Sequence, residues 1–148
     1  MMQNLNNNKV EIRGYVPGAI GRITELHATY YSKHWGLKLN FEAEIATELS
    51  KFLLRFDETH DGIWIAVLDG NIVGSIAIDG NNDRGARLRW FIVSPKSQGC
   101  GIGQLLMQKA IDFCIKANLS RVYLWTFAGL PQPVTSTISL DLSLMRNM

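Results

Sequence analysis

The stretch Ser94–Leu106, SPKSQGCGIGQLL, contains the residues whose types and spacing are best suited to chemistry. Gly99, Gly101 and Gly103 alternate directly before an apolar pattern with helical spacing. The first N–H groups of a helix lack partners within it, and the helix dipole places about half a positive charge there. Glycines let these N–H groups approach phosphate oxygens because no Cβ intervenes. The stretch therefore predicts a phosphate-binding loop.

Two common phosphate-binding patterns do not fit this loop. In the Rossmann pattern G-x-G-x-x-G the last glycine is replaced by Gln104 when counted from Gly99, and by Leu106 when counted from Gly101. The P-loop pattern fails because no Gly-Lys-Ser/Thr follows. The remaining segment, Gln98–Gly103, resembles the Gln/Arg-x-x-Gly-x-Gly/Ala signature of the GNAT N-acetyltransferases.

The segments on both sides of the loop strengthen this resemblance. The preceding strand ends in FIVSP at Phe91–Pro95, similar to the fourth strand of the family and its Val-x-Pro exit. GIGQLLMQKAIDFC at Gly101–Cys114 is similar to its central helix. The alternative is a glycine loop that only turns the chain, and the context favours the family. The resemblance covers roughly Val10 to Pro131.

The resemblance implies an acetyl-CoA-dependent N-acetyltransferase that acts on a primary amine of a small molecule or peptide. Backbone N–H groups that would bind the pyrophosphate of acetyl-CoA belong to Gln98, Gly99, Cys100, Gly101, Ile102 and Gly103. The pantetheine arm would pair with the main chain of Phe91, Ile92 and Val93. An N–H near Val93 would polarise the thioester carbonyl that the amine attacks.

The catalytic acid and base are not assigned by the sequence. Many family members carry a Glu base on the fourth strand, but the corresponding segment Ala86–Val93, ARLRWFIV, contains no acid. Asp79 and Asp83 are close in sequence, and we expect them to be solvated turn residues. Trp90 and Trp125 are strand residues, which favours core positions over an acceptor pocket.

The histidines and cysteines predict neither a metal site nor a disulfide framework. His27, His34 and His60 lack the spacing of metal ligands. Cys100 and Cys114 are the only cysteines of the chain, and we expect reduced thiols in a cytoplasmic protein. Cys100 would lie near the cofactor, but a nucleophilic role is disfavoured.

Length and composition predict one globular domain. The chain has 148 residues, 47% hydrophobic and 19% charged, with a net charge of +2. This small charge gives no argument for nucleic acid binding. The polar start MMQNLNNNKV does not resemble a signal peptide, and no segment is long and apolar enough to predict a membrane span.

Hydrophobic periodicity and turn residues predict the elements around the loop. The predicted strands are Val10–Val16, Gly62–Leu68, Ile72–Ile78, Ala86–Val93 and Arg121–Thr126. The predicted helices are Ile20–Trp35, Phe41–Phe56 and Gly103–Ala117. The order β-α-α-β-β-β-α-β matches that of the family, so the resemblance implies an α/β (α+β) GNAT fold with a mixed central sheet flanked by helices.

Residues 1–130 are expected to form the acyl-CoA-binding domain, and residues 131–148 an atypical C-terminal tail. After the fifth strand the family continues with a helix that begins Ala-Ala-Arg-x-x-Tyr, and this Tyr usually protonates the leaving thiolate. Here the family pattern looks truncated or frameshifted, and no Tyr follows Tyr123. We therefore expect weak turnover. The alternative is a catalytically impaired acyl-CoA-binding protein or a sensor.

The tail also contains an alternating apolar pattern. Ile138, Leu140, Leu142 and Leu144 alternate with polar residues, which is typical of a strand with one buried face. We expect this strand to cover an open sheet edge beyond Arg121–Thr126, either within the chain or exchanged between two copies in a homodimer.

Overall fold

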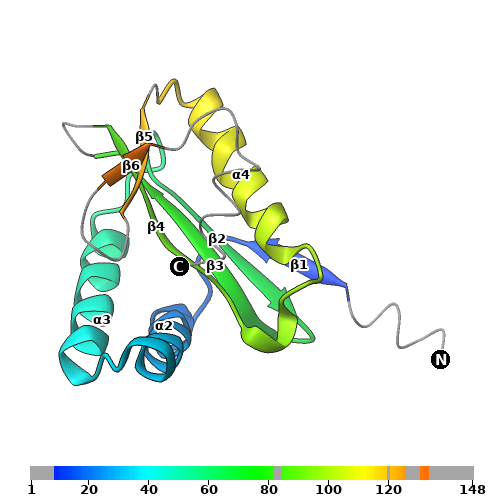
Figure 1. Cartoon of the computed structure of the whole chain (residues 1–148). Coiled ribbons are helices and arrows are strands. Elements are labelled where there is room, and N and C mark those ends of the chain that lie inside the picture. Colours follow the sequence, from blue (N-terminus) through cyan, green and yellow to red (C-terminus); the bar gives the residue numbers. More distant parts are fainter. Residues whose placement is uncertain (1–8, 82–84, 120, 126–130, 134–148) are drawn as a thin grey trace.

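The structure is a computed structural model that describes residues 9–81, 85–119, 121–125 and 131–133. The strands are β1 (Val10–Arg13), β2 (Gly62–Leu68), β3 (Asn71–Asp79), β4 (Ala86–Val93), β5 (Val122–Trp125) and β6 (Pro131–Pro133). The helices are α2 (Ala19–Trp35), α3 (Leu39–Leu54) and α4 (Ile102–Lys116), with a 3₁₀ turn η1 (Pro95–Ser97) after β4. The six strands form one sheet in chain order (Figure 1). The predicted mixed α/β fold is confirmed.

Helices cover both faces of the sheet. Figure 1 shows α4 on one face and α2 with α3 on the other. The buried residues of α4 are Ile102, Leu106, Met107, Ala110 and Cys114, and they share a core cluster with Ile76 and Ile78 of β3. The second cluster joins Ala19 and Ile23 of α2 to Leu49 and Phe52 of α3, Ile65 of β2, Ala77 of β3 and Trp90 of β4. The sheet is therefore the middle of three layers.

The hairpin between β2 and β3 has the predicted tight turn. Asp69 has φ 53° and Gly70 has φ 79°, the positive values that a two-residue hairpin turn requires. The two strands pair antiparallel from Gly62 opposite Ile78 to Leu68 opposite Asn71. In the order of the sheet β3 lies between β2 and β4, so this hairpin is the support against which β4 pairs.

Strand β4 has a neighbour on its β5 side over only part of its length. It pairs antiparallel with β3, but its parallel pairing with β5 is confined to Ala86–Leu88. Among the described strands, none pairs with residues 89–93 on that side. This open edge of β4, defined here as residues 89–93, leads directly into the glycine loop.

Two expectations near the ends of the fold change. Strand β1 ends at Arg13 rather than Val16. The edge beyond β5 is not bare, because β6 pairs with it antiparallel, with Pro133 opposite Tyr123. The predicted strand over residues 138–144 lies outside the described residues, so that strand and its homodimer remain predictions.

Candidate functional site

The glycine loop turns through two left-handed backbone positions. After η1, Gln98 is extended, Gly99 has φ 87°, and Gly101, the N-cap of α4, has φ 81°. A Cβ added to Gly99 or Gly101 would meet nothing within 4 Å. These two positions therefore favour glycine because of backbone conformation rather than lack of space.

Among the described residues, no side-chain hydrogen bond caps the N-terminus of α4. The first turn of this helix contains no acidic residue. The Leu105 N–H donates to the Gly101 carbonyl at 3.0 Å, so the N–H groups of Ile102, Gly103 and Gln104 precede the first intrahelical bond. With the dipole of a 15-residue helix behind them, these groups can bind an anion.

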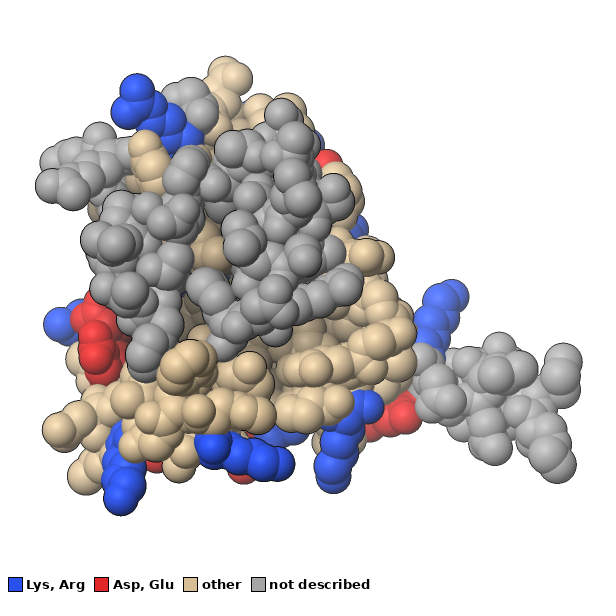
Figure 2. All heavy atoms as spheres, viewed as in Figure 1, with Lys and Arg blue, Asp and Glu red and all other residues tan. Residues whose placement is uncertain are grey.

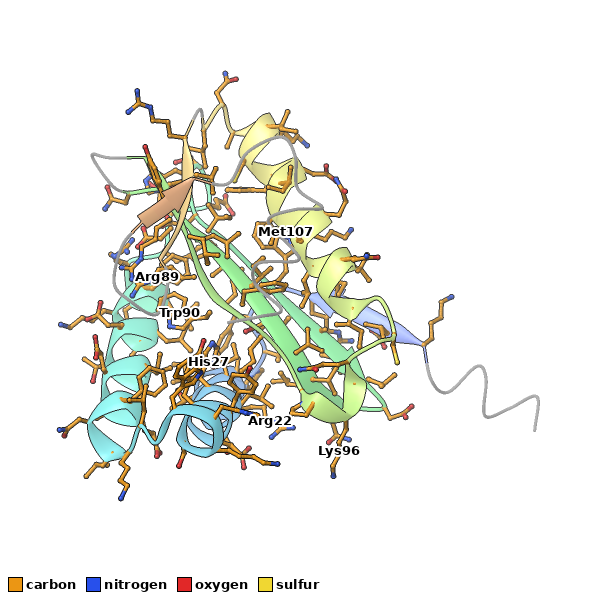
Figure 3. All side chains as sticks on the ribbon, in the orientation of Figure 1. Arg22, His27, Arg89, Trp90, Lys96 and Met107 are labelled. Carbon is orange, nitrogen blue, oxygen red and sulfur yellow. The ribbon has the colours of Figure 1, made fainter. Side chains whose placement is uncertain are left out.

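The loop lies against the end of β4. A Cβ on Gly103 would be 3.6 Å from Phe91 Cζ and 3.7 Å from Val93 Cγ2, which is ordinary contact. The predicted loop residues and the predicted strand residues are thus brought together. Lys96, on η1, adds an exposed cation to the same turn (Figure 3).

The backbone of Val93 faces the open edge of β4. The Ser94 N–H donates to the Val73 carbonyl of β3 at 2.7 Å, and backbone groups of successive strand residues point to opposite sides. The side-chain Nε2 of Gln98 donates to the Val93 carbonyl at 3.2 Å, in agreement with that direction. The same alternation directs the backbone of Ile92, which lies opposite Ser75, toward β3. Of Ile92 and Val93, it is therefore Val93 whose N–H faces the open edge.

A β-bulge interrupts β4 just before this point. Ser75 lies opposite Ile92 and Ala77 opposite Arg89, so one residue of β3 faces two of β4. Within the bulge Trp90 has φ 49°, an unusual value for a large side chain. The sequence pattern did not predict this bulge.

The bulge places two large side chains on the α3 side of the sheet. Trp90 is 7% exposed and packs on Phe52, with ring centroids 5.3 Å apart. The Arg89 guanidinium lies 4.1 Å from the centroid of the Trp90 ring. Figure 3 shows both residues on the α3 side of β4, and Met107 of α4 at the opposite face. The predicted core position of Trp90 is confirmed.

The Asp79 carboxylate, at the end of β3, is buried, contrary to the prediction that Asp79 is a solvated turn residue. Asp79 is 6% exposed rather than solvated, and its Oδ2 accepts from Arg55 Nη2 at 2.7 Å and from Arg89 Nη1 at 3.5 Å. Arg89 Nη2 also lies 3.6 Å from Glu48 Oε1 of α3. These contacts hold Arg89 between β3 and α3. Asp83 lies outside the described residues.

His27 is a buried neutral histidine of α2. Its Nδ1 lies 2.8 Å from the Ile23 carbonyl, so this nitrogen carries the proton that is donated. Burial lowers the pKa of His27 from 6.5 to about 4, and the bond to Ile23 only partly opposes this. In the described ranges, no three His, Cys, Asp or Glu residues are grouped so that they could hold a metal ion.

We expect acid to destabilise the fold partly through His27. The unfolded chain takes up this proton below about pH 6.5 but the folded protein only near pH 4, so stability is lost as the pH falls between these values. Between pH 7.5 and 5 the contribution is about 2 kcal/mol. Urea unfolding of the wild type and His27→Leu at both pH values measures it. If both proteins lost the same free energy of unfolding between pH 7.5 and 5, the assignment of this pH dependence to His27 would be contradicted.

The two thiols differ in exposure, and the described basic side chains are spread apart. Cys100 is exposed in the loop, whereas burial raises the pKa of the Cys114 thiol to about 11. In Figure 2 the described Lys and Arg side chains lie separately around the rim of the view, without a continuous basic patch on the described surface of that face. No helix among the described residues combines the length and apolar character needed to span a membrane.

Comparisons of sequence identify related proteins. The model of the Acetyltransferase (GNAT) family matches residues 20–132. An uncharacterized N-acetyltransferase of Archaeoglobus fulgidus is 33% identical over 81 residues, covering 51% of this chain and 54% of the relative. Human N-acetylaspartate synthetase is 38% identical over 66 residues, covering 44% of this chain and 22% of that protein. The matches thus span about half or less of these relatives.

Solved structures share the fold. An acetyltransferase of the GNAT family from Staphylococcus aureus superposes with a TM-score of 0.68 at 19% identity, covering 94% of this chain and 82% of that one. A GNAT family acetyltransferase from Brucella melitensis in complex with acetyl-CoA gives 0.62 at 20% identity, covering 80% and 77%.

Proposed function

Because the chain belongs to the GNAT acetyltransferase family, we propose that it transfers the acetyl group of acetyl-CoA to a primary amine. One observation carries this proposal. An uncapped helix N-terminus with glycines at its entry adjoins the open edge of β4, where the Val93 N–H has no strand partner in the described sheet. An extended ligand with a pyrophosphate at one end and a carbonyl at the other fits that combination.

The residues of the site have distinct roles in this proposal. Backbone N–H groups over residues 98–103 would hold the pyrophosphate. Main-chain groups of Phe91 and Val93 would pair with the pantetheine arm, and the Val93 N–H would stabilise the charge that develops on the carbonyl oxygen. Acetyl-CoA would supply the activated thioester. The amine nitrogen then forms a bond to the carbonyl carbon, and the carbon–sulfur bond breaks with its electron pair on the sulfur of CoA. The amine loses a proton, and the CoA thiolate takes one up to leave as the free thiol.

We propose an amine as the acceptor, and aspartate is the first candidate to test. Three of the matching relatives, from human, Xenopus tropicalis and Rattus norvegicus, are named N-acetylaspartate synthetase. We also propose slow turnover, because residues 124–148, where the family pattern has a Tyr that protonates the thiolate, contain no Tyr. Tyr123 itself lies opposite Arg87, in the paired part of β4 and β5 rather than beside Val93.

The unpaired cysteines support a cytoplasmic location.

A thiol-release assay tests the proposal. In separate reactions, the wild type is mixed with acetyl-CoA and one amine, and the free CoA thiol is measured. The amines are L-aspartate, other amino acids, a polyamine and a short peptide. We expect amine-dependent release with at least one acceptor. Binding of acetyl-CoA without release for any amine supports an acyl-CoA-binding protein or sensor instead. If acetyl-CoA does not bind, both the acetyltransferase and the acyl-CoA-binding protein or sensor are contradicted.

A further inference from the structure

The middle of β3 contains a buried hydroxyl group with one specific partner. Ser75 is 1% exposed, and apolar residues and Gly74 surround it in the strand sequence IVGSIAI. Its Oγ donates to the carbonyl of Trp90 at 2.6 Å, across the pair of strands. A buried hydroxyl is costly unless it is bonded, so this bond accounts for a serine in the core.

The carbonyl that Ser75 holds belongs to the bulge of β4. Trp90 adopts φ 49°, a strained value for a bulky residue that persists only where the surroundings enforce it. The indole is held by Phe52 and Arg89, and the Ser75 hydroxyl holds the backbone itself. Backbone strain held in this way clusters at functional sites.

The bulge decides which way the end of β4 faces. Trp90 packs in the cluster of α2 and α3, whereas Phe91 and Val93 pack against the cluster of α4. A shift of one residue reverses the direction of every side chain that follows, and the backbone N–H groups alternate with them. Loss of the extra residue from the bulge would turn Val93 away from Gly103 and the open edge.

We propose that Ser75 is a positioning residue for acetyl transfer. Through the Trp90 carbonyl it keeps the β4 bulge in the register that directs the Val93 N–H to the open edge, beside the N-terminus of α4. Ser75 itself touches neither substrate. This inference rests on the proposed function, in which the Val93 N–H donates to the carbonyl oxygen of the thioester.

The test compares Ser75→Ala with Ser50→Ala. The control removes a similar bond, because Ser50 Oγ donates to the Ala46 carbonyl at 2.6 Å within α3. Both variants and the wild type are measured for the free energy of unfolding, the acetyl-CoA dissociation constant, and kcat and KM for the amine that the wild type acetylates best. Each variant removes one hydroxyl group and one bond of 2.6 Å, so a loss of kcat confined to Ser75→Ala reports on the place of the lost bond in the fold.

We expect kcat of Ser75→Ala to fall about tenfold to a hundredfold, because displacement of a transition-state donor by a fraction of an ångström weakens catalysis steeply. The dissociation constant of acetyl-CoA should change by less than about threefold, because the pyrophosphate loop is intact. Ser50→Ala should keep kcat within about twofold. In the apo protein, the backbone amide resonances of Trp90 and Val93 should shift in Ser75→Ala and not in Ser50→Ala.

The outcomes separate this inference from the proposed function. A folded Ser75→Ala with wild-type kcat overturns the positioning role while acetyl transfer by the wild type stands. A wild type that does not bind acetyl-CoA removes the proposed function, whatever Ser75 does. If Ser75→Ala does not fold, Ser75→Cys keeps the size of the side chain with a weaker donor, and an unchanged kcat in that variant overturns the role equally.

Discussion

Gly103→Glu is expected to lower the affinity for acetyl-CoA by about a hundredfold or more while the protein stays folded, because a carboxylate near bound phosphate repels it by several kcal/mol at an effective dielectric near 20. Gly103 lies in the first turn of α4 and has ordinary backbone dihedrals, and its Cβ would make only normal contacts with Phe91 and Val93. Calorimetric titration with acetyl-CoA measures the loss, and circular dichroism checks the fold.

Two substitutions at the same position separate charge from size. Gly103→Ala should keep the affinity close to that of the wild type, since the added Cβ has room. Gly103→Gln has the length of Glu without its charge, so its loss of affinity should be much smaller. Unchanged affinity in Gly103→Glu would remove the assignment of this loop to the pyrophosphate.

Asp61→Ala is expected to destabilise the fold by about 2–4 kcal/mol, because it leaves the two backbone N–H groups that bond to this carboxylate without an acceptor. The Asp61 side chain is fully buried. Its oxygens accept from the Gly80 N–H at 2.9 Å and the Asp57 N–H at 3.0 Å, and Arg55 Nη1 lies 3.6 Å away. The substitution would leave these donors facing an empty space. Guanidinium unfolding, with the slope compared between proteins, measures the change.

Asp112→Ala is the matched control for this prediction. Asp112 is exposed on α4, where it accepts from Gln108 at 2.8 Å, and its loss should cost less than about 1 kcal/mol. A loss in Asp61→Ala as small as that in Asp112→Ala would show that the buried carboxylate does not hold the end of β3 in place.

The elements around the site were predictable from local patterns. The bounds of β2 and β4 agree with their predicted ranges, because apolar and β-branched runs end there at glycine or proline. Helix α4 begins one residue before the predicted Gly103. The glycine pattern also predicted the loop, since two of its glycines have the left-handed backbone that few other residues adopt.

Features that depend on distant partners were not predictable in the same way. A period-two pattern does not reveal an inserted residue, so the bulge at Trp90 was missed, and the only local sign was a serine inside an apolar strand. Asp79 was predicted to be solvated because its partner Arg55 lies 24 residues earlier. Strand β6 was missed because its prolines argue against a strand.

Titration of ¹⁵N-labelled protein with acetyl-CoA tests most directly whether the glycine loop and the open edge of β4 hold the cosubstrate. We expect saturable shifts of the backbone amides, largest over residues 98–103 and at Val93, while those of β1 at the far edge of the sheet stay in place. An absence of shifts, or shifts centred on another part of the chain, would contradict this binding site.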